Sequence, residues 1–195
     1  MIAVQQGLIP AATLKLLGWS FETKVPTPKK YVALAYPHTS NWDGLLFVSV
    51  TRSLGLPLSW MIKDAWVRGP LRAPLKGLGA VAVDRKRHSN LVTAMIQEFE
   101  RRDAFVLGIP PEGTRSRAPH WKSGFYHIAL GAKVPVVPGY LDVRRKRAGM
   151  GPPIDLTGDV RKDMDAIRAY YAQIDPVAFV PSNVGPIRLR EEDTP

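Results

Sequence analysis

Short apolar runs that alternate with helical stretches constrain the fold of this chain most strongly. The runs have the length and composition of buried strands, and they cover residues 31–35, 58–62, 80–83 and 104–109, while residues 134–138 lead into one more. Helical patterns lie between or after them, at residues 43–54, 64–78 in pieces, 89–102, 124–130 and 159–172. This alternation predicts an α/β layered single domain with a largely parallel central sheet flanked by helices.

The 195 residues suffice for one domain with a sizeable core. We expect a short N-terminal helical segment over residues 1–23, broken by Pro10, and a main domain over residues 24–195. The N-terminal segment is apolar-rich, and it fits a helix packed on the core and an amphipathic membrane-surface anchor about equally well. Trp19 and Phe21 have the aromatic character of residues that sit at lipid headgroup level.

The charge balance predicts an anionic partner. Lys and Arg number 27 against 17 Asp and Glu, a net charge of +10, which suits nucleic acid, anionic lipid or a phosphorylated substrate. There are no cysteines, so disulfides and thiolate chemistry are excluded and a reducing compartment is favoured. Neither a secretory signal nor an apolar stretch long enough to span a bilayer is evident. We therefore expect a cytoplasmic protein that is soluble or peripheral to the membrane.

Polar residues follow three of the predicted strands at the point where each strand ends. His38 comes after the first strand, Arg85 after the third and Glu112 after the fourth. In α/β sheets the loops at the carboxyl ends of the strands form the site. The three positions are therefore expected to share one cleft.

His38 and Asp43 are separated by four residues on a strand-to-helix turn. A carboxylate that binds one imidazole nitrogen fixes the tautomer and raises the basicity of the other nitrogen, which can then accept a proton from an attacking hydroxyl. The simpler alternative is a histidine that caps a loop, with Asp43 serving the helix N-terminus. Thr39 and Ser40 lack a nucleophile-elbow pattern, which favours direct transfer without a covalent enzyme intermediate.

Residues 111–116, Pro-Glu-Gly-Thr-Arg-Ser, form a second compact motif. Gly113 permits close backbone approach to a ligand, Thr114 offers a hydroxyl, and Arg115 can bind a phosphate bidentately. Glu112 is expected to bind a substrate hydroxyl or to orient Arg115, since a carboxylate repels phosphate. A surface Glu–Arg turn is the alternative for any single pair of this kind. The remaining histidines lack metal-ligand spacing, so no metal site is expected.

In this order the blocks resemble the glycerolipid acyltransferases, whose best-known members acylate lysophosphatidic acid. His38 to Asp43 matches the His-four-residues-Asp (HX4D) block, and residues 111–116 match the Pro-Glu-Gly-Thr-Arg-Ser signature. Residues 79–85 and 134–138 resemble the two remaining blocks. The resemblance implies that His38 is the general base and Asp43 its orienting partner. It also implies that the glycerol phosphate is bound by Arg85, Glu112, Gly113, Thr114 and Arg115.

The resulting expectation is an O-acyltransferase that moves a fatty acyl group from acyl-CoA or acyl-carrier protein to a lysophospholipid. The implied acceptor is 1-acyl-glycerol-3-phosphate, giving phosphatidic acid, at the inner face of the cell membrane on an anionic membrane surface. No cofactor and no nucleic acid are implied. Pro37, Ala82 and Pro110 depart from the family pattern at the pocket wall, so a lyso-aminolipid or glycolipid acceptor stays open. A non-catalytic anion-binding module and a thioesterase are further alternatives.

Overall fold

The computed structural model describes residues 11–22, 28–56, 58–63, 72–77, 79–83 and 88–193. Its centre is a seven-stranded sheet with the strand order β1-β7-β6-β2-β5-β3-β4. The strands are β1 (Ser20–Phe21), β2 (Lys30–Tyr36), β3 (Leu58–Lys63), β4 (Ala80–Val83), β5 (Phe105–Ile109), β6 (Val136–Asp142) and β7 (Arg147–Met150). All neighbouring strands are parallel except β6 and β7. The predicted α/β class with a largely parallel sheet is therefore confirmed.

The antiparallel hairpin of β6 and β7 and the short β1 were not predicted. The tight turn between β6 and β7 places Lys146 at a φ of 48°. β7 pairs in turn with β1, with Ser20 opposite Arg147 and Phe21 opposite Ala148. Strands of two and four residues that carry polar and basic side chains lack the apolar run that marks a buried strand. The second half of the predicted N-terminal segment thus contributes an edge strand to the sheet.

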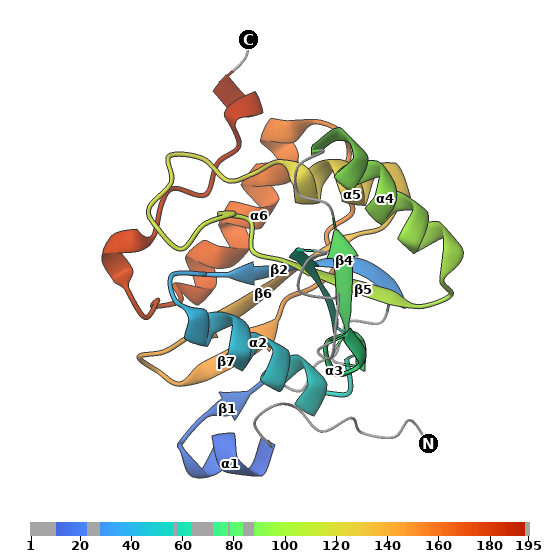
Figure 1. Ribbon diagram of the computed structural model, residues 1–195. Coiled ribbons are helices and arrows are strands. Elements are labelled where there is room, and N and C mark those ends of the chain that lie inside the picture. The colour runs from blue at the N-terminus through green and yellow to red at the C-terminus, as the bar shows by residue number, and fades with distance from the viewer. Residues whose placement is uncertain are drawn as a thin grey trace.

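Helices cover both faces of the sheet. They are α1 (Ala11–Leu16), α2 (Asn41–Ser53), α3 (Arg72–Gly77), α4 (His88–Arg101), α5 (Gly124–Ala132) and α6 (Val160–Ile174). Figure 1 shows α4, α5 and α6 on one face and α2 on the other. The helices predicted at 43–54, 89–102, 124–130 and 159–172 are all present, with ends shifted by at most two residues. Of the stretch predicted as helical pieces over 64–78, residues 72–77 form α3, and residues 64–71 and 78 lie outside the described residues.

The central strand β2 is buried on both faces, which explains its continuous apolar sequence. Val32 and Leu34 pack into the core beneath α4, α5 and α6. Tyr31 and Ala33 point to the opposite face, where they meet Phe47 of α2. The strand is therefore held rigidly between two apolar layers, and it delivers His38 to the edge of the sheet two residues after its end.

Helix α1 lies on the α2 side of the sheet. Its Leu14 is fully buried against Leu46 and Val50 of α2. Gly18, at a φ of 85°, allows the chain to turn from α1 into β1. Among the described helices none is long and apolar enough to cross a membrane.

After α6 the chain runs back across the molecule as a tail over residues 175–193. It contains two 3-10 turns, Pro181–Asn183 and Arg190–Asp193. The tail is fastened at several points: the backbone N–H of Trp121 donates to the Arg188 carbonyl at 2.7 Å, and Arg168 binds the Glu192 carboxylate at 2.7 Å. This packing brings the tail beside the loops that follow β2 and β5.

Candidate active site

The loops after β2 and β5 meet because the two strands are neighbours in register, with Leu34 opposite Ile109. The structure therefore brings together His38, Asp43, Glu112 and Arg115 at the carboxyl edge of the sheet. Arg85, the third predicted member of this edge, lies outside the described residues.

His38 faces Asp43 across the turn into α2. The His38 Nδ1 atom lies 3.8 Å from the Asp43 Oδ2 atom, and the carboxylate is almost fully buried whereas the imidazole is partly exposed. The separation is long for a hydrogen bond but close for a charge, so Asp43 can stabilise a protonated imidazole. This arrangement leaves Nε2 as the nitrogen that does not face the carboxylate.

Asp43 also builds the start of α2. Its Oδ2 atom accepts hydrogen bonds from the backbone N–H groups of Thr39, at 2.5 Å, and Ser40, at 2.6 Å. The Ser40 hydroxyl accepts in turn from the backbone N–H of Trp42, which completes a reciprocal N-terminal cap. The simpler alternative for Asp43, a helix-capping role, is thus present together with the contact to His38. One carboxylate fixes the loop that carries the histidine and supplies the charge beside it.

The electrostatics favour a neutral His38. Burial lowers the pKa of this imidazole, the Asp43 carboxylate opposes that effect, and the Arg115 guanidinium lowers the pKa further. Burial also raises the pKa of Asp43, while the hydrogen bonds from Ser40 and Thr39 oppose the rise. A histidine that is unprotonated near neutral pH can accept a proton, as a general base must.

Glu112 is buried against the loop that carries His38. Its side chain is buried, with 3% of its surface exposed. Both carboxylate oxygens accept from the backbone N–H of His38, at 3.2 and 3.1 Å. Burial raises the pKa of Glu112 to about 7, and the nearby Asp43 charge adds to the rise. Glu112 thus ties the two motif loops together, and its predicted contact with the acceptor stays a prediction.

Gly113, Thr114 and Arg115 are exposed on the same loop. Gly113 has a φ of 66°, and a Cβ atom there would lie 2.7 Å from the Lys122 Cγ atom, so the position is restricted to glycine. The Arg115 guanidinium donates to the Asn41 Oδ1 atom at the start of α2. A cation therefore stands at the surface beside the His38 loop, where an anionic substrate can reach it.

Sequence reasoning missed the part that the tail plays here. The Thr39 hydroxyl accepts from the Val180 backbone N–H at 3.1 Å, and the Asn183 side-chain amide donates to the Arg115 carbonyl at 2.9 Å. Thr39 and Val180 are 141 residues apart, and no local motif marks the tail. Asn41 and Lys122 were also missed, although Asn41 lies inside the first motif. Among the described residues no group of three His, Asp or Glu side chains is placed to hold a metal ion.

Comparisons with known proteins show a sequence family and a similar fold. The sequence model of the Acyltransferase family matches residues 20–142, which include both motif loops. The fold is similar to the crystal structure of PlsC, the 1-acyl-sn-glycerophosphate (LPA) acyltransferase of Thermotoga maritima, with a TM-score of 0.56. That similarity covers 87% of this chain and 78% of the other at 14% sequence identity, so it concerns the fold. A search among curated proteins finds no match.

Proposed function

Since this chain belongs to the acyltransferase family, as its sequence resemblance predicted, we propose that it acylates a lysophospholipid. The proposed donor is a fatty acyl thioester of CoA or acyl-carrier protein, and the proposed acceptor is 1-acyl-glycerol-3-phosphate. The product is then phosphatidic acid. The single observation that supports this most is a partly exposed imidazole backed by a buried carboxylate, beside an exposed arginine.

In the proposed reaction His38 acts as the general base. Its Nε2 atom takes the proton of the acceptor hydroxyl while that oxygen attacks the thioester carbonyl. The new C–O bond forms, the C–S bond of the tetrahedral intermediate breaks, and the departing sulfur receives the proton from the imidazolium. Asp43 stabilises the imidazolium between the two proton transfers.

The phosphate of the acceptor would lie against the loop after β5. We assign its binding to the Arg115 guanidinium and the exposed groups of Gly113 and Thr114, with Arg85 as the proposed second cation. For Glu112 we propose a positioning role in addition to the acceptor contact that the resemblance implies, because its carboxylate holds the His38 backbone. The proposal includes neither a metal nor a cofactor.

Thiol release from a long-chain acyl-CoA tests this function directly. We expect release by the wild type only with lysophosphatidic acid present, and loss of that release in His38→Ala. Equal release without acceptor would indicate a thioesterase instead. Faster release with a lyso-aminolipid or a lyso-glycolipid than with lysophosphatidic acid would indicate a different acceptor for the same acyl transfer.

A complete absence of release with both donors and all acceptors would refute acyl transfer. The anion-binding alternative then makes its own prediction, which is salt-sensitive binding to nucleic acid that His38→Ala leaves unchanged. We place the enzyme at the cytoplasmic face of the membrane as a peripheral protein, since its acceptor is a lipid.

A further inference from the structure

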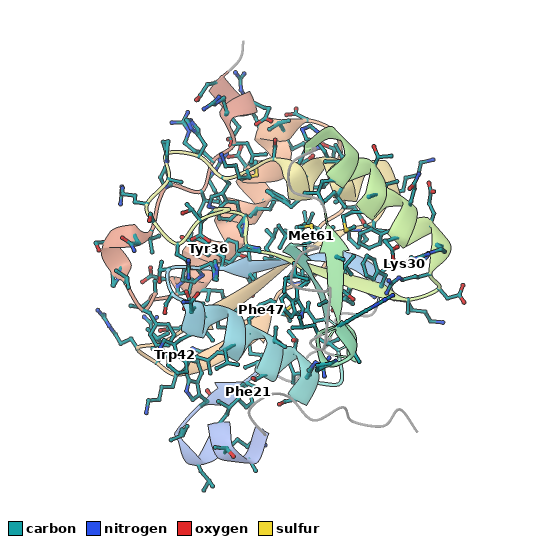
Figure 2. All side chains as sticks on the ribbon, in the orientation of Figure 1. Phe21, Lys30, Tyr36, Trp42, Phe47 and Met61 are labelled. Carbon is teal, nitrogen blue, oxygen red and sulfur yellow. The ribbon has the colours of Figure 1, made fainter. Side chains whose placement is uncertain are left out.

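The loop over residues 113–120, which follows β5, is fixed at both ends. Before it, Glu112 is buried and binds the backbone N–H of His38. After it, Trp121 is buried, and its ring packs against Tyr36 with 5.2 Å between the ring centroids. Figure 2 shows Tyr36 at the carboxyl end of β2. Between these two anchors the loop contains no helix or strand, and most of its residues are exposed.

The tail contacts this loop at its middle. The Asn183 side-chain amide donates to the backbone carbonyl of Arg115 at 2.9 Å. Two residues further on, the Arg117 guanidinium donates to the Val184 carbonyl at 2.6 Å. Figure 1 shows the loop after β5 and the tail side by side. The part of the loop that lies between the two anchors is therefore held by a segment from the other end of the chain.

Gly185 allows the tail to lie directly against the loop. A Cβ atom at this position would stand 2.1 Å from the carbonyl oxygen of Ala118, so any side chain must push the two segments apart. The position needs a glycine for space and not for a positive φ. Because this packing holds the same part of the loop, loss of the exposed Arg117 hydrogen bond alone should displace Arg115 little.

The tail is itself anchored beyond Gly185. Leu189 is fully buried in the main core, and it forms an isolated β-bridge with Trp121. The Arg168 guanidinium of α6 binds the Glu192 carboxylate at 2.7 Å. A segment that is fastened to the core and to a helix can hold in place a loop that has no regular structure of its own.

Arg115 is thereby held at two points. Its carbonyl accepts from the Asn183 amide, and its guanidinium donates to the Asn41 Oδ1 atom at the start of α2. The first contact fixes the backbone and the second fixes the end of the side chain. A cation that is ordered before the ligand arrives binds an anion more tightly, because less conformational freedom is lost on binding.

We propose that Asn183 and Gly185 are positioning residues for acceptor binding. They seat the tail against the loop and so fix Arg115 where it meets the acceptor phosphate. The identity of this ligand rests on the proposed function. Both residues act through Arg115, and the tail contacts the His38 loop at a separate point, Val180. Their loss should therefore change the acceptor KM and leave kcat nearly unchanged.

Acceptor-dependent thiol release with lysophosphatidic acid measures this effect. We expect Asn183→Ala to raise the acceptor KM about fivefold and Gly185→Ala about tenfold, with kcat within about twofold of the wild type. Two control variants should keep the wild-type KM. Ser182→Ala changes an exposed residue of the same 3-10 turn, and Gly124→Ala adds a Cβ atom where nothing lies within 4 Å.

A double variant separates positioning from general destabilisation. If Asn183 acts through Arg115, Asn183→Ala should raise the KM less than about twofold in a chain that already carries Arg115→Ala. An equal rise in both backgrounds would overturn the proposal. A fall in kcat with an unchanged KM, or the same rise in Ser182→Ala, would overturn it as well.

Cleavage by trypsin tests the contact between tail and loop without the enzymatic reaction. Trypsin cuts after arginine, and Arg115 and Arg117 are exposed within the loop. Cleavage of a folded chain requires local opening, so Asn183→Ala and Gly185→Ala should be cut there at least about threefold faster than the wild type. Ser182→Ala should be cut at the wild-type rate.

Equal cleavage rates in all variants would overturn the proposal, whether or not the protein transfers acyl groups. Faster cleavage of Asn183→Ala and Gly185→Ala in a protein without acyl transfer would refute the proposed function. In that case the seating of Arg115 by the tail would stand, and the acceptor phosphate would be excluded as its purpose.

Discussion

Asp43→Asn is the sharpest test of the site, because it removes a charge and keeps the shape of the side chain. At 3.8 Å the interaction of the Asp43 carboxylate with a protonated His38 amounts to about 4 kcal/mol at an effective dielectric constant of about 20. That energy is available in the transition state, where the imidazole carries the proton, and it is missing for the neutral imidazole of the ground state. At 1.4 kcal/mol per factor of ten, we expect kcat to fall about 10³-fold.

A control must separate the effect of the Asp43 charge on His38 from the effect of Asp43 on the N-terminal cap of α2, because the same carboxylate does both. Ser40→Ala removes the hydroxyl that accepts from the Trp42 N–H and leaves the carboxylate in place. It should cost about 1 kcal/mol in the free energy of unfolding, measured in urea, and change kcat only a few-fold. The measurement is acceptor-dependent thiol release at saturating substrates. A loss in Ser40→Ala as large as in Asp43→Asn, or a loss below tenfold in Asp43→Asn, would refute the role of the charge.

Further predictions concern the loop after β5. Arg115→Ala should raise the acceptor KM at least about tenfold. Arg117→Ala, in the same exposed loop, should change this KM little. Equal effects of the two substitutions would refute phosphate binding by Arg115. Gly113→Ala should cost about 2 kcal/mol in urea unfolding, from its φ of 66° and the contact with Lys122. The pKa of Glu112 lies at about 7 in the native state against 4.5 as the ordinary value. The native state therefore holds this proton more tightly, and its stabilising effect is complete below pH 4.5 and lost as the pH rises to about 7. Between about pH 5 and 7.5 the Tm of the wild type should therefore fall more than the Tm of Glu112→Gln. An equal change of Tm with pH in the two proteins would contradict this prediction.

The sequence predicted the strands that are buried on both faces, because such strands need continuous apolar runs. β2 is the clearest case, since Val32 and Leu34 pack on one side of the sheet and Tyr31 and Ala33 on the other. The loops that follow β2 and β5 could be placed at one edge for a topological reason, as parallel strands end together. The contact between His38 and Asp43 could be predicted from the sequence because both residues lie on one turn.

The role of Glu112 could not be read from its motif. Its carboxylate binds the backbone of His38, 74 residues earlier, and that contact depends on β2 and β5 being neighbours in register. A motif shows which side chain follows a strand and gives no sign of whether that side chain turns outward to substrate or inward to another loop. The contact of Glu112 with the His38 loop follows from its burial, and burial is a property of the packed sheet.

The tail shows the same limit in a larger element. An α/β sheet leaves the loops at its carboxyl edge open to solvent, and loops of this kind need partners for their backbone groups. In this chain the tail binds both motif loops: the Val180 backbone N–H donates to the Thr39 hydroxyl, and the Asn183 amide donates to the Arg115 carbonyl. The same segment exposes the side chains of Phe179 and Val180 beside this contact with Thr39. A segment that follows α6 therefore steadies two loops that lie far from it in sequence, and only the packed chain brings the three together.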